Sequence, residues 1–391
     1  MESLKDIKVD KIIKQGSSWL LKSGIQNKGK KNLGAFSAWY GTKNKKYSYL
    51  YSEISGYLIT HMCFMYEYTN KKIYLTSAIN SADWLIKCAQ DTTGGFKCLF
   101  LLDKKIKLDF KSEQIYSFDN GVIINGLVNL YKITKNKKYL NSATKCGNWI
   151  VNKAQKKNGE IKPIYDLSKN SFVEDKKKWS WISGSYHTKI SIGLLNLYSV
   201  NKKKIFLISS KKIFNTSLKK QIKSGEFLST KISTNLHPHC YSAEGLWVGS
   251  KFLKNKNYLK AVIKSTKWIF KNQDLDGLVP RLRVGKKYIY SERVDALAQS
   301  VRLVLLLLKG NKIDKNKFDP QIKKVIKIIV KYQSQSKRLK EQGGFYWGKT
   351  SKGKTSMDLN CWVTSFVIQT LILFKYYQAN KKFKFKTFYL I

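Results

Sequence analysis

Residues that could carry out acid–base chemistry gather in six short segments spread along the chain. The segments are YSEISGY (51–57), FDNG (118–121), WSWISGSYHTK (179–189), LHPHCYSAEG (236–245), SERVDALAQSVR (291–302) and MDLNCW (357–362). Three of the four histidines, His187, His237 and His239, lie in these segments. Histidine shuttles protons near neutral pH, and carboxyl groups act as general acids or bases. We therefore predict Asp119, His187, His239 and Glu244 as the catalytic residues.

The same segments contain aromatic rings beside amides and charged groups, which is typical of a carbohydrate site. A sugar stacks its C–H faces on aromatic rings, while acids, amides and histidines bind its hydroxyl groups. The predicted binding residues are Glu53, Tyr57, Asn120, Trp181, Tyr186, His237, Tyr241, Arg293, Gln299, Arg302, Asn360 and Trp362. Two simpler interpretations stay open. The polar residues at helix starts could be N-caps, and the aromatic residues could only fill the centre of the fold.

The few arginines favour an acidic sugar. Lysine is the usual cation of this chain, yet four of its five arginines fall between Arg281 and Arg302. The planar guanidinium matches a carboxylate or sulfate in a two-pronged geometry that lysine cannot supply. Arg293 or Arg302 could therefore bind a uronate carboxylate, although Asp295 could equally neutralise them.

An internal repeat indicates which elements position these segments. Residues 52–96 and 118–161 align almost without gaps. Tyr66, Tyr74, Leu75 and Trp84 of the first unit correspond to Tyr131, Tyr139, Leu140 and Trp149 of the second. Weaker copies cover residues 185–227, 240–279 and 294–347. Such a period predicts a fold that is built from repeated supersecondary units.

Each unit is predicted to be a helical hairpin, because its apolar residues recur at intervals of three and four. An apolar helix at 358–378 and an amphipathic helix at 10–26 would form a sixth hairpin if the chain closes on itself. We therefore predict an all-α fold, an (α/α)6 toroid whose N- and C-terminal helices close the ring, as one domain over residues 1–391. The first helix of each pair is poorer in lysine, so we expect it to lie in a buried inner ring.

Composition narrows the class of protein. The chain has 74 Lys and Arg against 25 Asp and Glu, a net charge of +49. The lysines are spread along the chain beside many Asn, Ile and Tyr residues, as an AT-rich coding sequence produces, so we do not expect a specific nucleic-acid partner. The six cysteines are scattered, and neither a signal peptide nor a membrane span is expected. We predict a cytoplasmic protein without a metal or cofactor, and its oligomeric state stays open.

The segments YSEISGY, FDNG, SYHTK, HPHCYSAEG and ERVDALAQ at the predicted inner-helix starts resemble those of the six-hairpin glycosidase superfamily and its polysaccharide-biosynthesis relatives. Uronyl hydrolases of that superfamily use an aspartate as general acid and base, and Asp119 is the position that is similar here. The resemblance thus implies a hydrolase that acts on a uronate-containing oligo- or polysaccharide. The chain lacks the adjacent Asp-Asp pair that a close hydrolase match would have.

Other members of the superfamily imply alternatives. Acylglucosamine epimerases use two histidines with a glutamate and an arginine, for which His187, His239, Glu244 and Arg293 are the similar residues. Lyases and uronyl C5-epimerases abstract a proton beside a neutralised carboxylate, and Asn120, His187, Tyr241 and Arg293 would take those roles. A non-catalytic glycan-binding protein in surface-polysaccharide biosynthesis is the third alternative.

Overall fold

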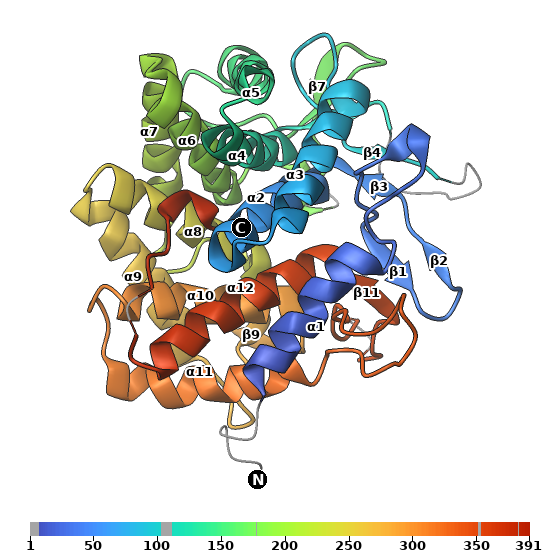
Figure 1. Cartoon of the computed structure of the whole chain (residues 1–391). Coiled ribbons are helices and arrows are strands. Elements are labelled where there is room, and N and C mark those ends of the chain that lie inside the picture. The colour runs from blue at the N-terminus through green and yellow to red at the C-terminus, as the bar shows by residue number, and fades with distance from the viewer. Residues whose placement is uncertain (1–7, 103–111, 177, 351–352, 382) are drawn as a thin grey trace.

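The computed structural model describes residues 8–102, 112–176, 178–350, 353–381 and 383–391. In this part of the chain, twelve α-helices alternate between the inner and outer layers of a ring (Figure 1). The inner helices are α2 (Ser52–Thr69), α4 (Ser117–Thr134), α6 (Ile190–Asn201), α8 (Leu236–Phe252), α10 (Val294–Leu308) and α12 (Cys361–Gln378). The outer helices are α1 (Val9–Lys22), α3 (Lys72–Trp84), α5 (Lys137–Trp149), α7 (Lys204–Lys219), α9 (Lys256–Lys271) and α11 (Lys315–Val330).

The two layers differ in how their side chains are buried. All 15 residues of the inner helix α10 are buried. The outer helix α9 instead buries one stripe, which includes Tyr258, Ala261, Val262 and Ser265, and its lysines face solvent. Spacings of three and four residues place such a stripe on one side of a helix. The predicted contrast between a buried inner ring and an amphipathic outer ring is confirmed.

The two ends of the sequence close the ring. Helix α12 packs against both α1 and α2, and Lys375 of α12 is ion-paired with Asp10 of α1 at 2.6 Å. The sixth hairpin is therefore split between the ends of the sequence, as predicted. The last residues described, including the short helix η7 (Thr387–Tyr389), run into the centre of the ring, where Ile391 is buried (Figure 1).

A repeated glutamine, which the sequence analysis did not identify, links each outer helix to the next. After every outer helix, the side-chain amide of one glutamine donates to a backbone carbonyl of the following outer helix at 2.9 to 3.1 Å. The pairs are Gln26–Ser77, Gln90–Ser142, Gln155–Ser209, Gln221–Ala261, Gln273–Gln321 and Gln333–Ile12. The last of these bonds joins α11 back to α1 and so completes the circle.

Short antiparallel strands stand at one end of the ring and lead into the inner helices. They are β1 (Trp39–Gly41), β2 (Lys46–Tyr47), β3 (Leu50–Tyr51), β4 (Leu99–Phe100), β5 (Gln114–Tyr116), β6 (Ile164–Asp166), β7 (Ser171–Val173), β8 (Ser233–Asn235), β9 (Pro280–Val284), β10 (Lys287–Tyr290) and β11 (Asp358–Asn360). They form sheets in the orders β3-β4, β5-β6-β7, β10-β9-β8 and β11-β1-β2. Strands β3, β5, β8 and β11 each end directly before an inner helix. Pairing such as Tyr116 with Ile164 therefore fixes where these helices begin and which way their first turns face.

Candidate active site

A cavity of about 210 Å³ lies at the end of the ring where the strands enter the inner helices. Its lining contains the carboxyl groups of Glu53 and Asp119, together with His237, Arg293, Ser180 and Ile54. The remaining lining residues are aromatic, namely Tyr49, Tyr51, Tyr116, Phe118, Trp179, Tyr186, Tyr241 and Trp362. Acid groups, one cation and aromatic walls thus meet in one concave site, the usual composition of a small-molecule pocket.

The two carboxyl groups come from the first turns of neighbouring inner helices, Glu53 from α2 and Asp119 from α4. Burial raises the pKa of Glu53 to about 7, and the Tyr51 hydroxyl and the Lys189 ammonium limit that rise. Burial, and then the charge of Glu53, raise the pKa of Asp119 well above its ordinary range. The negative charge of one carboxylate disfavours the ionisation of the other. The pair therefore retains a proton at neutral pH.

Asp119 lines the cavity with one unpaired carboxyl oxygen and does not cap α4, although its carboxyl group also has a hydrogen bond with Cys98. Its side chain is 3% exposed, and its Oδ2 has no hydrogen-bond partner among the described residues. It is the third residue of α4, inside the first turn. A buried carboxyl oxygen that the protein leaves unpaired is costly unless a proton or a ligand satisfies it. The N-cap interpretation of Asp119 is therefore wrong, and the oxygen is available to a substrate.

The aromatic walls form one packed set. The Phe118 ring lies 4.7 Å from Tyr241 and 5.5 Å from Tyr186, measured between ring centroids. Trp179 stands edge-on to Tyr186 at 5.1 Å. Aromatic rings held by one another lose little freedom when a ligand binds, so they present preformed flat surfaces.

Arg293 lines one edge of the cavity, whereas its partner Asp295 is fully buried and does not line it. The Nε and Nη2 atoms of Arg293 donate to the two carboxylate oxygens of Asp295 at 2.9 and 3.1 Å. The Trp362 indole donates to the same carboxylate at 3.1 Å. Burial alone would raise the pKa of Asp295, but the charge and hydrogen bonds of Arg293, together with the hydrogen bond from Trp362, hold it well below its usual value. Asp295 is therefore ionised and holds Arg293 in place. The alternative in which Asp295 neutralises the arginines applies to Arg293 but not to Arg302, which is paired with Glu244.

The structure brings Asp119, Glu53, Tyr186, His237, Tyr241, Arg293 and Trp362 together, as the sequence predicted. It does not bring the other predicted catalytic residues to the cavity. His239 is fully buried, where its Nδ1 accepts from the Phe227 amide at 3.1 Å and its Nε2 bonds the Ser265 hydroxyl at 2.8 Å. His187 is buried against the Gly184 amide at the start of the short helix η6 (Ser185–Lys189). Both nitrogens of His239 are thus used by the backbone and a serine, so its catalytic assignment is wrong.

Glu244 also lies away from the cavity, in a buried ion cluster with Lys189 and Arg302. Its two oxygens accept from the Lys189 ammonium and the Arg302 guanidinium, and Glu244 and Arg302 have no exposed surface. These two cations lower its pKa against the effect of burial. Arg302 also donates to Gln369 at 3.0 Å and to the backbone oxygen of Ile391. The predictions of Glu244 as catalytic and Arg302 as substrate-binding are therefore corrected, because neither lines the cavity and each is bound by buried structural partners.

The remaining predicted residues have structural partners close to the site. The Asn120 side chain bonds the backbone of Phe96 and Tyr116, and that of Asn360 caps α12. Gln299 lies within hydrogen-bond distance of His237 but does not line the cavity. Tyr57 and Trp181 pack beside the cavity without lining it. Sequence reasoning missed Tyr49, Tyr51, Tyr116 and Phe118 as lining residues. A signal was available for two of them, since Tyr51 and Phe118 belong to the segments 51–57 and 118–121, whereas Tyr49 and Tyr116 each lie two residues before such a segment.

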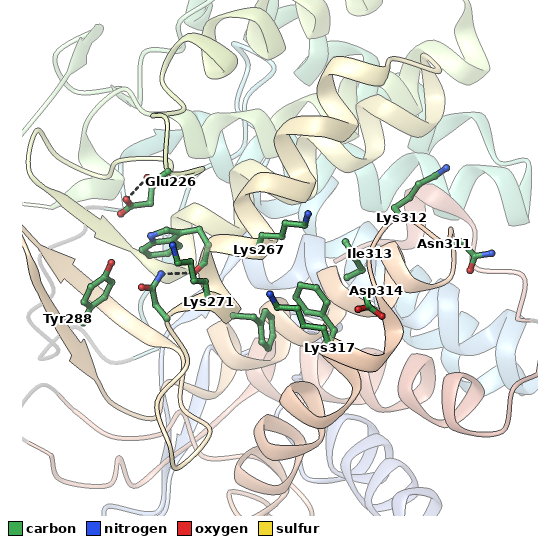
Figure 2. Close-up of a pocket in the computed structure, with 14 residues that line it drawn as sticks. Glu226, Lys267, Lys271, Tyr288, Asn311, Lys312, Ile313, Asp314 and Lys317 are labelled. Atoms are coloured by element: carbon green, nitrogen blue, oxygen red, sulfur yellow. Dashed lines mark hydrogen bonds between the residues drawn. The ribbon is translucent and has the colours of Figure 1, made fainter.

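A larger groove of about 650 Å³ lies on the outside of the ring, between α9, β10 and the turn before α11 (Figure 2). Four lysines line it, Lys267, Lys271, Lys312 and Lys317. Of its carboxylates, Glu226 is ion-paired with Arg283, and Asp314 caps α11 by accepting from the Asn316 amide. This outer groove lacks the paired acid groups of the ring-end cavity, so we place the candidate reaction site in the latter.

Metal-binding clusters and membrane-spanning helices are both absent from the described ranges. No group of three or more His, Cys, Asp or Glu side chains there is arranged to hold a metal ion. No helix among the residues described has the length and apolar character that crossing a membrane requires.

Comparisons with known proteins agree on the fold. A sequence model of glycosyl hydrolase family 76 matches residues 110–273, which is less than half of the chain. No curated protein sequence matches.

Solved structures match over nearly the whole chain. Cellobiose 2-epimerase from Bacillus thermoamylovorans has a TM-score of 0.75 and 14% identity, covering 94% of this chain and 100% of its own. A D-mannose isomerase gives 0.74 and 13%, with coverages of 96% and 99%. Unsaturated glucuronyl hydrolase from Bacillus sp. GL1 gives 0.66 and 14%, with coverages of 93% and 96%. Together with the twelve-helix ring, these matches confirm that the chain has the (α/α)6 fold of the six-hairpin glycosidase superfamily.

Proposed function

We propose that this protein is a carbohydrate-active hydrolase that acts on a uronate-containing saccharide in the ring-end cavity. One observation carries the proposal: Glu53 and Asp119 share an aromatic-walled cavity, and burial raises the pKa of both. Glycoside hydrolysis by most enzymes uses two such carboxyl groups, one protonated and one ionised. The match to glycosyl hydrolase family 76 includes Asp119 and supports the same class of reaction.

The pKa values assign the two roles. Asp119 keeps its proton at neutral pH and would donate it to the oxygen of the leaving group. Burial raises the pKa of Glu53 to about 7, which is less than the rise at Asp119, so Glu53 is the carboxyl group that ionises first. It would take a proton from the attacking water or stabilise the positive charge that develops on the sugar ring. The C–H faces of the sugar would rest on rings such as Tyr241 and Trp179.

Proton abstraction is the less favoured alternative, because the cavity lacks a strong base of the required kind. The two histidines that an acylglucosamine-type epimerase would need, His187 and His239, do not line it. His237 does, but burial and then Arg293 lower its pKa to about 3, which makes it a weak base. Burial also raises the pKa of Tyr241 well above 10, so its phenolate is not available near neutral pH.

Positive charge at one edge of the cavity supports an acidic substrate. The guanidinium carbons of Arg281 and Arg293 lie 5.0 and 5.2 Å from the centroid of the Trp347 ring. Asp295 is bonded to Arg293, whereas Arg281 donates to the Ser291 hydroxyl and to a backbone carbonyl. Asp295 thus balances the charge of Arg293 but not that of Arg281, which lies beside the cavity wall, and this remaining charge would suit a uronate carboxylate.

The test uses the purified full-length chain with saturated and 4,5-unsaturated uronate oligosaccharides. Absorbance of the unsaturated uronate and the formation of reducing ends are followed together. With the unaltered protein, we expect loss of the absorbance band or gain of reducing ends. The rate of that reaction should be at least 100-fold lower in Asp119→Asn and in Glu53→Gln. The matched control is Asp83→Asn on the outer helix α3, whose carboxylate pairs with Lys138 at 2.7 Å, and it should keep full activity.

The same experiment separates the alternatives. Gain of the unsaturated band would instead establish a lyase. Deuterium uptake from heavy water without either signal would establish an epimerase. Binding of the saccharides without any of these reactions would identify a glycan-binding protein and overturn the proposal.

A further inference from the structure

His237 is held by a chain of hydrogen bonds that reaches from the cavity to the buried ion cluster. Its Nδ1 lies 2.6 Å from Oε1 of Gln299. The Nε2 of Gln299 in turn donates to Glu244 at 3.1 Å. His237 and Glu244 belong to α8 and Gln299 to α10, two inner helices that pack side by side.

Chemistry fixes the direction of this chain. Glu244 is ionised, because Lys189 and Arg302 lower its pKa, and a carboxylate only accepts hydrogen bonds. The Gln299 group that faces Glu244 must therefore be the NH₂, and the group that faces His237 must be the carbonyl oxygen. A carbonyl only accepts, so Nδ1 of His237 must carry a proton and donate it.

A second contact places the proton on the same nitrogen. Oδ2 of the ionised Asp295 lies 3.6 Å from Nδ1 of His237, so a carboxylate and a carbonyl both surround that atom. The imidazole is neutral at physiological pH, since burial and then Arg293 lower its pKa to about 3. A neutral ring with a proton on Nδ1 has a bare lone pair on Nε2.

We infer that His237 presents the Nε2 lone pair to the cavity and selects a sugar hydroxyl there, with Gln299 and Glu244 acting as positioning residues that set its tautomer. Gln299 does not line the cavity, whereas the His237 ring does, so the ring edge without Nδ1 is the one left for a ligand. The ring is held 4.4 Å from Tyr241, which limits its rotation.

The inference deepens the proposed function and rests on it for the nature of the ligand. A lone pair accepts a hydrogen bond from a hydroxyl group but repels the oxygens of a carboxylate or sulfate. The saccharide must then offer a free hydroxyl at His237, while any acidic group lies at the Arg293 edge. A substrate with a sulfate ester at the hydroxyl facing His237 would leave two acceptors unpaired against each other.

The direct test needs no substrate. Nitrogen NMR of the full chain labelled with ¹⁵N-histidine reports the tautomer of each of the four histidines, and the signals lost in His237→Gln assign that residue. We expect a neutral ring with the proton on Nδ1, unchanged between pH 5 and 8. A proton on Nε2, or a ring that becomes charged in that range, would overturn the inference. In Gln299→Leu, we expect a mixture of the two tautomers.

A matched pair of variants then tests recognition with whichever oligosaccharide the activity assay identifies. The amide of His237→Gln reaches the position of Nε2, whereas that of His237→Asn reaches only that of Nδ1. We expect kcat/KM of His237→Gln to be at least ten times that of His237→Asn. The difference should appear in KM and not in kcat, because the hydroxyl is bound equally in the ground state and in the transition state. Equal losses in kcat would overturn the recognition role. An inactive wild-type protein with the expected tautomer would refute the proposed function alone.

Discussion

Replacing Glu244 by glutamine tests whether the buried ion cluster stabilises the ring. Glu244 accepts from three buried donors, on Lys189, Arg302 and Gln299. Glutamine retains the shape but removes the negative charge, so two cations would face each other without their shared counter-ion. Removing one partner of a buried pair costs about 3 to 5 kcal/mol, because the other charge stays buried and unpaired. The ratio of folded to unfolded protein would fall by roughly two to four powers of ten.

Urea denaturation followed by circular dichroism measures this loss, and the pH dependence gives a second check. Burial first, and then Arg302, lower the pKa of Lys189 to about 8, despite the opposing effect of Glu244. Between that value and about 10.5, the unfolded chain binds more protons at this lysine than the folded chain, so stability rises with pH. Without Glu244 the folded pKa falls further. The deficit of Glu244→Gln should therefore shrink as the pH rises to about 8, the folded pKa of Lys189 in the unaltered protein, and stay constant above it.

The matched control is Glu160→Gln, because Glu160 also has two lysine partners, Lys220 at 2.9 Å and Lys156 at 3.8 Å. These pairs are solvent-accessible, so their loss should cost less than about 1 kcal/mol. If Glu244→Gln costs no more than Glu160→Gln, or if its deficit grows with pH, the reasoning about the buried cluster is refuted.

Three further predictions concern the cavity and the ring. The rate constant kcat/KM should rise with pH through about 7, as Glu53 ionises, and fall at higher pH, as Asp119 loses its proton. Glu53→Gln should remove the rise near pH 7 from the pH–rate profile. Arg293→Lys should raise KM at least tenfold for saccharides with a carboxylate but little for their neutral methyl esters, because lysine cannot bond Asp295 through two nitrogens and still offer a third nitrogen to the substrate. Gln333→Ala should lower the free energy of unfolding by about 1 to 3 kcal/mol in urea denaturation, because the carbonyl of Ile12 loses its donor.

Controls make these outcomes decisive. Arg338→Lys changes an arginine whose side chain is 69% exposed, and it should leave KM unchanged. Gln335→Ala changes an exposed glutamine two residues from Gln333 and should cost less than about 0.5 kcal/mol. A pH profile without a limb near 7, equal changes in KM for both kinds of saccharide, or equal losses in the two glutamine variants would each contradict the corresponding argument.

Helical periodicity and the internal repeat were sufficient to predict the ring, because both are local properties of the sequence. The spacing of apolar residues decides which face of a helix is buried, and Tyr66 and Tyr131 mark equivalent places in successive hairpins. An apolar helix near one end and an amphipathic helix near the other could bury their faces only against each other and their neighbours. The sixth hairpin follows from that need alone. Five of the six segments contain residues of the first turn of an inner helix, whereas the segment 179–189 leads through the short helix η6 into α6, which begins at Ile190.

Which side chains enter the cavity was decided by tertiary structure. Successive residues of a helix point about 100° apart, so a shift of one position separates a wall residue from a core residue. Asp119 points into the cavity, whereas the adjacent Asn120 bonds the backbone of Phe96. Glu244 and His239 have the residue types of a catalytic pair, but both lie deeper in α8, where buried partners saturate them. The sequence by itself determined the architecture and the end of the ring where polar groups gather. Only the packing of inner helices against one another decided that Glu53 and Asp119 share a cavity, because their meeting depends on side-chain directions set by contacts across the ring.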